Sequence, residues 1–526
     1  MLSRIEQLNR IGIALSAEHD KSRLLTTILS GAQNLTGADG GTLYLLENDR
    51  LHFKIMRNRS LGIDLYDDGT NCIAFPAIPL HGESGEANLK TVAAYAALTG
   101  KTINIPNIQE NADFDFSGTL DYDARSGYSS ESFLTVPMRN HEDDIIGVLQ
   151  LINSINPDDN SIQPFTDEDQ QLVESLASQA AIAITNQRLI QELQALMEKF
   201  IEVIATAIDE KSPYTGNHCR RVPEIAMMMA DAINNTSDGP LADFELDEKD
   251  LYELRIAALL HDCGKITTPV HVVDKATKLE TIFDRIHLLE SRFEIIRRDL
   301  EIEQLKYQLR SAGTEYDSTE VEYQLQQLDE DFEFLKQANM GTEFMPEADQ
   351  ARVRKISDRQ WQTHHGETRT LITEEEINNL TIAKGTLLQE EREIINNHIV
   401  TTINMLEALP FPKHLQNVAE IAGNHHERMD GKGYPRGLKR EQMSIQARLM
   451  GVADIFEALT AADRPYKKAM PLSQALKILA NMAKEGHVDP DLLEIFIQQK
   501  IYLRYAEKYL RPEQIDAVNI EKLLAG

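Results

Sequence analysis

The chain has 526 residues, of which 42% are apolar, so it is long enough for roughly two to four domains with buried cores. Its net charge of -31 argues against a sequence-independent grip on a nucleic-acid polymer, because such a grip needs clustered lysine and arginine. The cysteines Cys72, Cys219 and Cys263 are too scattered for a disulfide framework and favour a reducing compartment. No apolar run approaches the roughly 18 to 20 residues that cross a bilayer, and the first residues predict an amphipathic helix rather than a signal peptide. We therefore expect a cytoplasmic protein that contacts neither a membrane nor a nucleic-acid polymer.

Residues 1–187 alternate helical and strand patterns. Two helical stretches precede a pair of strands in GGTLYLLENDRLHFKIMRN, joined by a turn at Asn48 and Asp49. A second pair, SFLTVPMRN and IIGVLQLINS, is separated by a charged tip from His141 to Asp144. Short strands flanked by helices predict a small α+β domain built on an antiparallel sheet.

The order of these pieces resembles a GAF domain, a sensory fold, through GTLYLL, LTGKTINIPN, FLTVPM, IIGVLQLIN and FTDEDQQLVESLASQ. The resemblance implies either a sensor for an unknown small-molecule ligand or a domain that mainly dimerises and relays strain. Some cyclic-nucleotide-binding members carry an Asn-Lys pair followed by Phe and later by Asp-Glu. Here Asn153, Phe165 and Asp169 are present, but Ser154 and Gln170 replace the Lys and the Glu. This difference argues against cyclic-nucleotide binding.

A long helix follows this domain. From Leu172 to Ile204, apolar residues recur at spacings of four and three, which predicts a coiled-coil signalling helix over residues 170–210. Asn186, near the middle, is the kind of polar seam residue that sets the register of parallel dimers. We therefore predict a parallel homodimer through the 172–204 helix. The alternative is a single helix that packs on its own domain.

The second half of the chain carries candidate metal ligands. His261 and Asp262 stand at the end of an apolar helical run, and His425 and His426 are adjacent in NHHERMDGKGYP. Asp454 lies within the apolar helix IQARLMGVADIFEALTA, where an unpaired carboxylate would be costly to bury. Histidine and carboxylate side chains are ligands that divalent first-row metals prefer. These residues predict a metal-dependent hydrolase.

The segment from His425 to Met470 carries more lysine and arginine than aspartate and glutamate, although the whole chain is strongly acidic. This local positive charge suggests that a small anion is bound there. Lys265, three residues after Asp262, can reach the metal pocket as a point charge.

Two long, highly charged amphipathic segments interrupt these motifs between residues 280 and 340. Their apolar positions, beginning at Ile282, predict an antiparallel helical hairpin. We interpret residues 280–370 as an insertion for partner contact or dimer bracing. His364 and His365 lie in a polar loop of this insertion, and we expect them on the surface.

The motifs HDCGK, NHHERMDGKGYP, ARLMGVADIFEAL and TAADRPYKK resemble the HD-GYP family, a branch of the HD-domain phosphohydrolases that degrades cyclic di-GMP in bacteria. The resemblance implies an all-α HD-domain phosphohydrolase fold over residues 198–526, which contains the 280–370 insertion. The whole chain is thus expected to be a multi-domain protein: an α+β GAF-like domain, a connecting helix and an all-α domain.

The same resemblance implies a binuclear metal centre. One metal would be held by four residues, namely His218, His261, Asp262 and Asp454. The second would be held by His398, His425 and His426, with Asp262 bridging both. Members with a third metal carry a Glu where this chain has Tyr214, so we expect two divalent ions. The ligand types favour iron or manganese, with zinc as an alternative.

The resemblance also assigns roles in catalysis and substrate binding. Two cations would activate a bridging water and clamp the phosphate oxygens, and Asp262 and Lys265 are the catalytic candidates. Arg464 and Lys467 match positions that contact substrate phosphate. Four residues would shape a loop near the metals: Gly431, Gly433, Tyr434 and Pro435. The last three are also candidates for substrate binding.

Three functions fit these features. The first is a cyclic di-GMP phosphodiesterase that produces pGpG and, by a second cut, GMP, and that the N-terminal domain regulates. The second is a hydrolase of another cyclic dinucleotide such as 3′,3′-cyclic GMP-AMP. The third is a catalytically silent receptor that binds a nucleotide or a GGDEF-type cyclase. All seven ligand side chains are present, which favours an active enzyme.

Overall fold

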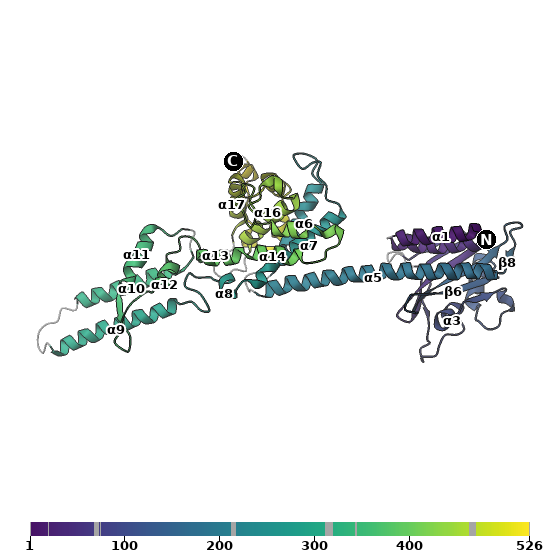
Figure 1. Ribbon diagram of the computed structural model, residues 1–526, viewed down its shortest axis with the longest axis horizontal. Coiled ribbons are helices and arrows are strands. Elements are labelled where there is room, and N and C mark those ends of the chain that lie inside the picture. The colour runs from purple at the N-terminus through teal and green to yellow at the C-terminus, as the bar shows by residue number, and fades with distance from the viewer. Residues whose placement is uncertain are drawn as a thin grey trace. The chain divides into compact units, whose positions relative to one another are not determined.

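The computed structural model describes residues 2–18, 20–67, 73, 75–211, 217–310, 319–341, 344–461 and 470–524. The chain divides into two compact units, Met1–Met197 and Glu198–Gly526 (Figure 1). Among the helices that the structure describes, none combines the length and the apolar character needed to cross a membrane.

The first unit is an antiparallel sheet with helices on both faces. Its helices are α1 (Leu2–Ala17), α2 (Lys21–Thr36), α3 (Val92–Thr99), η1 (Ile108–Glu110), α4 (Ser117–Ser126) and the first part of α5 (Asp167–Lys211). Its strands are β1 (Ala38–Glu47), β2 (Arg50–Asn58), β3 (Ile63–Tyr66), β4 (Ile78–Pro79), β5 (Ile103–Ile105), β6 (Phe133–Arg139), β7 (Ile145–Ile155) and β8 (Ile162–Gln163). The main strands follow the order β3-β2-β1-β7-β6-β5, while β4 pairs with β2 and β8 pairs with β7.

The two predicted strand pairs are confirmed. Asn48 and Asp49 join β1 to β2 and both have positive φ angles, 51° and 61°, which asparagine and aspartate tolerate better than most residues. Strands β6 and β7 pair in the same antiparallel sense. The predicted α+β class is therefore confirmed, although the short strands β3, β4 and β5 and the helices α3 and α4 were not predicted individually.

The two faces of the sheet are covered differently. Helices α1, α2 and α5 bury one face, in a core that contains Leu24, Ile28, Leu149 and Leu176. Helix α3 covers part of the other face with small alanine side chains, among them Ala94. Because alanines fill little space, this second face leaves room for a cavity between the sheet and helices α3 and α4.

The residues that resemble a cyclic-nucleotide motif have structural partners here. The buried amide of Asn153 accepts hydrogen bonds from the backbone N–H groups of Glu131 and Ser132, at 2.8 and 3.2 Å. The buried carboxylate of Asp169 binds Arg4 at 2.9 Å and accepts the N–H of Thr166. Both side chains therefore hold loops and helix ends of the first unit.

Helix α5 runs continuously from Asp167 to Lys211. The first residues of the predicted heptad seam, Leu172 and Leu176, are buried in the core of the first unit, so they are unavailable to a partner helix. From Ile190 onward several apolar side chains are exposed, with Leu193 at 66%. The predicted seam is therefore divided: its first residues belong to the core of the first unit, and exposed apolar residues begin further along the helix.

The second unit is helical apart from one small hairpin among its described residues. Its first helices are α6 (His218–Asn234), α7 (Glu248–Leu260), η2 (Cys263–Thr267), α8 (Val270–Val273), α9 (Ile286–Arg310), α10 (Thr319–Asn339), α11 (Glu347–Ser357) and α12 (Glu374–Leu380). Strands β9 (Gln360–Gln362) and β10 (Thr368–Thr370) form the hairpin. The remaining helices are α13 (Gln389–Asn396), α14 (His398–Glu407), η3 (Lys413–Leu415), α15 (Val418–Gly423), η4 (Arg440–Gln442), α16 (Ile445–Thr460), α17 (Leu472–Lys484), α18 (Pro490–Gln498), α19 (Ile501–Tyr509), η5 (Pro512–Gln514) and α20 (Ile520–Leu524).

Helices α6, α7, α14, α15 and α16 pack together and carry the candidate site. The apolar face of α6, which includes Val222, Ile225 and Met229, is fully buried. The predicted helical HD-domain fold of this half is confirmed.

The segment that separates the HDCGK motif from the later HD-GYP motifs, which includes α9 to α12, has its own hydrophobic core. Helices α9 and α10 pack on each other, and Leu289, Leu328 and Leu335 are buried together with residues of α11 and α12. The prediction that Ile282 belongs to the packed face is wrong, because this side chain is 96% exposed. The helix starts only at Ile286, where the carboxylate of Asp284 accepts the Ile286 N–H at 2.9 Å.

Candidate metal centre

Five helices bring seven predicted side chains to one place. His218 opens α6, directly after Asn217 in the left-handed conformation with φ of 68°. The chain leaves α7 at His261 and enters η2 through Asp262, so the two side chains follow the helix end. The other four come from the start of α14, from the segment after α15 and from α16: His398, His425, His426 and Asp454.

The carboxylate of Asp262 lies between two groups of histidines. Its Oδ2 atom is 3.3 Å from Nε2 of both His218 and His261. Its Oδ1 atom is 3.2 Å from Nε2 of His398. Asp262 can therefore offer one oxygen to each group.

Each group gathers donor atoms closely enough for one cation. The donor atoms of His218, His261 and Asp262 all lie within 4.8 Å of one another, and Oδ1 of Asp454 lies 3.1 Å from Nε2 of His218. The donor atoms of the second group lie within the same distance: His398, His425 and His426. The structure therefore brings together all seven residues that the sequence proposed.

Hydrogen bonds orient four of the five imidazoles. The Nδ1–H groups of His261, His398 and His425 donate to backbone carbonyls at 2.7, 2.5 and 2.6 Å. Nδ1 of His218 donates to Oε2 of Glu457 at 2.5 Å. In each ring the hydrogen bond at Nδ1 leaves Nε2 facing the centre of the cluster, where it can bind a metal ion once it carries no proton.

Glu457 is a functional candidate that the sequence analysis missed. It stands one turn after Asp454 on α16 and is 1% exposed. While Oε2 accepts from His218, Oε1 accepts from Nε of Arg221 at 2.6 Å. A second carboxylate one turn beyond Asp454, in an apolar run, was a signal that could have identified it.

The charges of the cluster favour a cation. Burial alone would raise the pKa of Asp262, but Lys265 and His261 hold it well below its ordinary value. Burial also opposes protonation of His218, yet hydrogen bonds to Asp262, Asp454 and Glu457 raise its pKa well above the ordinary value. Carboxylates that stabilise a proton at this position would stabilise a metal ion in the same way.

Two histidines of the other group, His425 and His426, are held neutral. Burial, together with the nearby His261, lowers the pKa of His425 to about 4. Burial and the charge of His425 lower the pKa of His426 well below its ordinary value. A neutral imidazole keeps the lone pair that binds a metal.

Unsatisfied atoms at the centre test whether this donor set fits divalent ions. Oδ1 of Asp262 and the Nε2 atoms of His398 and His425 are buried and have no hydrogen-bond partner among the described residues. Buried polar atoms without partners are rare in folded proteins, and a bound ion would give these three atoms the partner that they lack. Imidazole nitrogens and carboxylate oxygens are ligands of divalent transition metals, so the residues fit.

Lys265 reaches the same centre. Its Nζ atom lies 2.5 Å from Oδ2 of Asp262, and its side chain is 24% exposed, so it stands at the boundary between the cluster and solvent. Asp262 and Lys265, the predicted catalytic pair, are therefore in direct contact.

Helix η2 approaches α14 so closely that only glycine fits at one position. A Cβ atom on Gly264 would lie 2.0 Å from the carbonyl oxygen of His398. The Gly264 N–H donates to Oγ1 of Thr402 at 2.9 Å. Thr402 thus ties the segment of Asp262 to the helix of His398.

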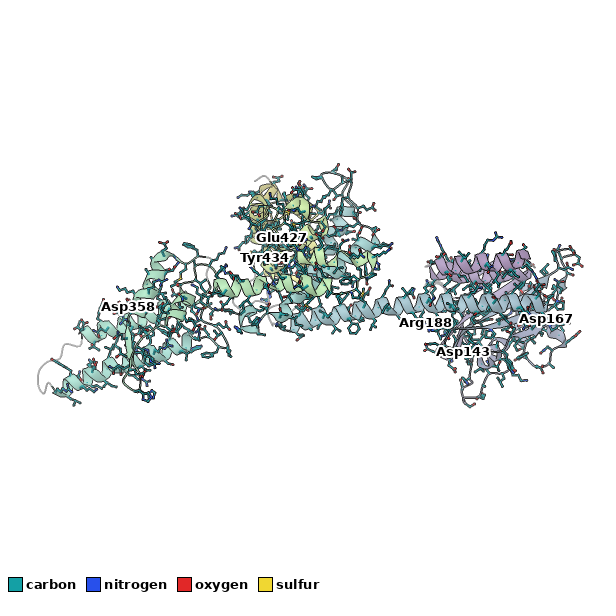
Figure 2. All side chains as sticks on the ribbon, in the orientation of Figure 1. Asp143, Asp167, Arg188, Asp358, Glu427 and Tyr434 are labelled. Atoms are coloured by element: carbon teal, nitrogen blue, oxygen red, sulfur yellow. The ribbon has the colours of Figure 1, made fainter. Side chains whose placement is uncertain are left out.

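Hydrogen bonds to the carboxylate of Glu427 hold the glycine-rich loop that follows His426. This carboxylate accepts the N–H groups of Arg436, Gly437 and Leu438 at 2.7, 3.1 and 2.9 Å. The ring of Tyr434 stacks on His426, with 4.9 Å between ring centroids (Figure 2 labels Glu427 and Tyr434).

The other predicted loop residues fit this arrangement. Gly433 lies against the backbone of Glu427, where a Cβ atom would approach within 2.4 Å, and Pro435 follows Tyr434 through a cis peptide bond. The predicted phosphate contacts Arg464 and Lys467, together with Tyr214, lie outside the described residues.

The last turn of α5 holds two segments of the centre. Nζ of Lys211 donates to the carbonyl oxygens of Lys265 at 2.9 Å and Thr268 at 2.7 Å, and also to that of Ile266. Asp209 accepts the backbone N–H of Cys219 at 3.2 Å, next to His218. The end of this helix therefore supports the backbone on both sides of the cluster.

Comparisons with known families agree with the two units. The GAF domain family matches residues 20–184. HD domain families match residues 215–339 and 373–492.

Curated relatives share part of this chain. The 3′3′-cGAMP-specific phosphodiesterase 1 of Vibrio cholerae is 41% identical over 93 residues, which are 17% of this chain and 21% of that protein. A cyclic di-GMP phosphodiesterase of Thermotoga maritima is 35% identical over 137 residues, 26% of this chain and 36% of that protein. The chain thus spans well under half the length of these relatives. Among solved structures, the GAF domain of an Acinetobacter phosphoenolpyruvate-protein phosphotransferase matches 36% of this chain and 98% of that chain, with 15% identity and a TM-score of 0.27.

Proposed function

This chain joins a GAF domain to an HD domain that carries the HD-GYP motifs, and from this we propose that it is a metal-dependent phosphodiesterase that hydrolyses cyclic di-GMP to pGpG. The observation that carries the proposal is the position of Asp262, with one oxygen facing His218 and His261 and the other facing His398. Six donor side chains around the Asp262 carboxylate, seven with Asp262 itself, are the ligand set of a binuclear centre.

We propose that two divalent ions, iron or manganese, occupy the two groups. The first would be held by His218, His261 and Asp454, the second by His398, His425 and His426, with Asp262 between them. When bound, the ions would supply Lewis-acid activation of the phosphodiester and of the water nucleophile. The hydrogen bonds at Nδ1 keep the imidazoles in place, so the ligands need little rearrangement.

Residues outside the ligand set are proposed to contact the substrate. The ammonium group of Lys265 can stabilise the negative charge of the leaving oxygen, because it stands at the solvent side of Asp262. The Tyr434 ring, stacked on His426 and half-buried, offers a flat face beside the second group for a guanine base or the sugar next to the cut bond. Arg464 and Lys467 are proposed to bind phosphate.

A second candidate substrate is 3′,3′-cyclic GMP-AMP. The match to a 3′3′-cGAMP-specific phosphodiesterase favours it, since that protein shares 41% of the aligned residues. The ligand set is compatible with both substrates, because the metals that it would hold act on the phosphodiester, which both substrates share, rather than on the base.

We also propose that the enzyme is a parallel homodimer through the exposed part of α5. Ile190, Leu193 and Phe200 are 56%, 66% and 60% exposed on one helix, and a second copy would bury them. Analytical ultracentrifugation of the full chain should give a dimer, and a Leu193→Glu, Phe200→Glu double variant should sediment as a monomer. A GGDEF-type cyclase as a further partner, and the GAF domain as the regulator of hydrolysis, stay predictions from the sequence.

A turnover panel tests the catalytic proposal. The full chain, purified anaerobically and loaded with Fe(II) or Mn(II), is offered cyclic di-GMP, 3′,3′-cyclic GMP-AMP and cyclic di-AMP. Cyclic di-GMP should be cleaved fastest, and His425→Ala should abolish turnover. His364→Ala is the matched control, since His364 is exposed and distant in sequence from the ligands. Faster cleavage of the mixed dinucleotide would replace the first substrate with the second, and metal-loaded protein without turnover would contradict both.

A further inference from the structure

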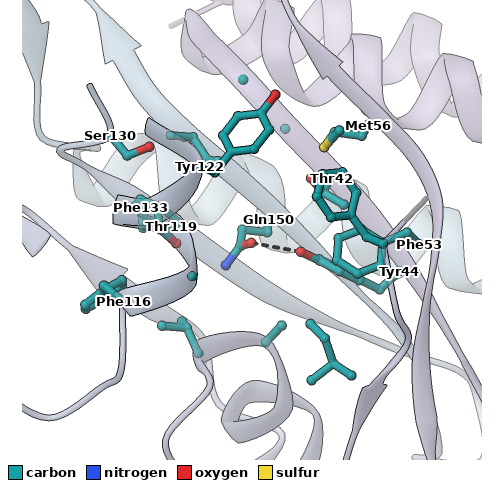
Figure 3. A pocket seen from close by; sticks show the side chains of 18 of the residues that line it. Thr42, Tyr44, Phe53, Met56, Phe116, Thr119, Tyr122, Ser130, Phe133 and Gln150 are labelled. Atoms are coloured by element: carbon teal, nitrogen blue, oxygen red, sulfur yellow. Dashed lines mark hydrogen bonds between the residues drawn. The ribbon is translucent and has the colours of Figure 1, made fainter. Parts of the chain in front are cut away.

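The first unit contains a cavity of about 430 Å³ between the sheet and helices α3 and α4 (Figure 3). This volume is in the range of small-molecule sites. Strands β1, β2 and β7 supply its floor, and Phe116, Thr119 and Tyr122 close it from the side of α4. The cavity is therefore formed within one compact unit and requires no partner chain.

Aromatic rings form one continuous wall. The Tyr44 and Phe53 rings lie 4.7 Å apart, Phe53 and Phe75 lie 5.4 Å apart, and Phe75 and Tyr122 lie 6.1 Å apart between centroids. Phe133 adds an apolar surface from β6. Flat rings arranged in this way favour a flat aromatic ligand, because stacked and edge-to-face contacts add to the gain from apolar burial.

One buried amide stands among these rings. Oε1 of Gln150 accepts from the hydroxyl of Tyr44 at 3.1 Å (Figure 3). Its Nε2 donates to Oγ1 of Thr135 at 3.1 Å. A glutamine amide has two N–H groups and two acceptor positions. Gln150 therefore keeps one donor and one acceptor position for a polar edge of a ligand.

The charged residues of the described lining are already paired. Arg57 binds the carboxylate of Asp64 at 3.1 Å and donates to Oγ of Ser30 at 2.6 Å. The carboxylate of Asp115 accepts the Ser117 N–H at 2.9 Å. The neighbouring segment 67–76 contains no lysine and no arginine in the sequence.

A phosphate or carboxylate inside this cavity would therefore lack a free cationic partner among the described lining residues, and an unpaired buried charge is costly. We propose that the cavity binds an uncharged, flat aromatic molecule, which stacks on the Phe53, Phe75 and Tyr122 wall and hydrogen-bonds the amide of Gln150. This proposal is independent of the chemistry of the HD domain.

A matched pair of fluorescent probes tests the charge preference on the full chain. N-phenyl-1-naphthylamine is neutral, and 8-anilinonaphthalene-1-sulfonate has the same rings with an added sulfonate. The neutral probe should give a saturable emission increase for one site per chain and bind at least about tenfold more tightly than the anion. The charge preference would be overturned if the sulfonate probe bound as tightly as the neutral probe and if Tyr122→Ala weakened the binding of the sulfonate probe.

Variants locate the probe. Phe75→Ala and Tyr122→Ala remove partly exposed rings, so the fold should tolerate them, and each should weaken the neutral probe at least about fivefold. Tyr66→Ala is the control, because Tyr66 is 49% exposed on β3 and lies outside the cavity. Unchanged affinity in both cavity variants would place the probe elsewhere and overturn the site.

A competition experiment tests whether the Gln150 amide hydrogen-bonds the ligand. Quinolin-2-one and naphthalene have the same fused-ring shape, but only the first carries a donor and an acceptor side by side. Quinolin-2-one should displace the neutral probe at lower concentration than naphthalene, and Gln150→Met should remove this advantage while both molecules still compete. An equal ranking of the two competitors in the unmodified protein would overturn the role of Gln150.

Discussion

Oε2 of Glu457 lies 2.5 Å from Nδ1 of His218, and the same carboxylate holds Nε of Arg221 through its other oxygen. The pair fixes the imidazole so that Nε2 faces Asp262 and Asp454. Glu457 therefore acts on the proposed centre through His218 and is a positioning residue.

Removal of the Glu457 charge should weaken metal binding. Glu457→Gln keeps the shape of the side chain but loses the carboxylate that orients His218, and partners of this kind contribute about 10- to 100-fold to metal affinity. Titration of the metal-free protein with Mn(II), followed by electron paramagnetic resonance, should show this loss of affinity at the metal site that contains His218. Glu441→Gln is the control, because Glu441 is exposed on η4. Equal Mn(II) affinity in the two variants would remove Glu457 from the site.

A methyl group at Gly264 should disturb the centre. A Cβ atom there would meet the His398 carbonyl at 2.0 Å and backbone N of Thr402 at 2.6 Å, so η2 and α14 must separate. We expect Gly264→Ala to lower stability by about 1–3 kcal/mol and to reduce metal content. Gly118→Ala should be neutral or slightly stabilising, because Gly118 lies in α4 and a Cβ there meets nothing within 4 Å. Thermal unfolding and metal analysis of both variants check this expectation.

Lys278 should make the stability of the segment around α9 and α10 depend on pH. Its side chain is buried, its Nζ donates to the carbonyl oxygen of Leu380 at 3.0 Å, and burial lowers its pKa from 10.5 to about 8. Between these two values the unfolded chain binds more protons than the folded chain, so stability rises with pH across the window from about 8 to 10.5.

Lys278→Met should remove this dependence. Relative to the unmodified protein, the variant should be more stable at pH 7 by up to about 3 kcal/mol, and the difference should shrink as the pH approaches 10.5. Denaturant unfolding followed by the fluorescence of Trp361, the one tryptophan of the chain, reports on this segment because β9 contacts α9. A difference that is constant from pH 7 to about pH 10 would contradict the buried-amine explanation.

Lys211 should matter for activity although it is distant in sequence from every ligand except His218. Lys211→Met removes the ammonium group that holds the carbonyl oxygens of Lys265, Ile266 and Thr268. We expect kcat to fall about tenfold or more, with a smaller change in KM, because the backbone that carries Lys265 loses its support. Lys211→Arg should restore part of the loss. Lys199→Met, on the exposed part of the same helix, is the matched control, and equal kcat in both methionine variants would exclude the role.

The sequence predicted the structure best where the chemistry of particular residues and the hydrophobic periodicity around them indicate the same feature. Asn48 and Asp49 marked the β1–β2 turn because few residues tolerate positive φ, and the pairs His261–Asp262 and His425–His426 marked segments that the fold brings together. Their roles as ligands stay predictions.

Other features depend on tertiary contacts that one sequence does not reveal. The periodicity of Leu172 and Leu176 suits a partner helix and a domain core equally well, and only the fold assigns them to the core. Ile282 continues the apolar spacing of α9, but Asp284 starts the helix after it. The partnership of Glu457 with His218 joins positions 239 residues apart.

The three carbonyl oxygens bound by Lys211 set a limit on how the second unit can be cut out for study. A fragment that starts at residue 212 would leave those oxygens without this donor and the Cys219 amide without Asp209. A fragment that starts near Glu198 keeps the final turns of α5, whose Ile201, Ala205 and Ile208 side chains are buried. Low activity in a shorter fragment would therefore report a damaged boundary rather than the loss of a sensory signal.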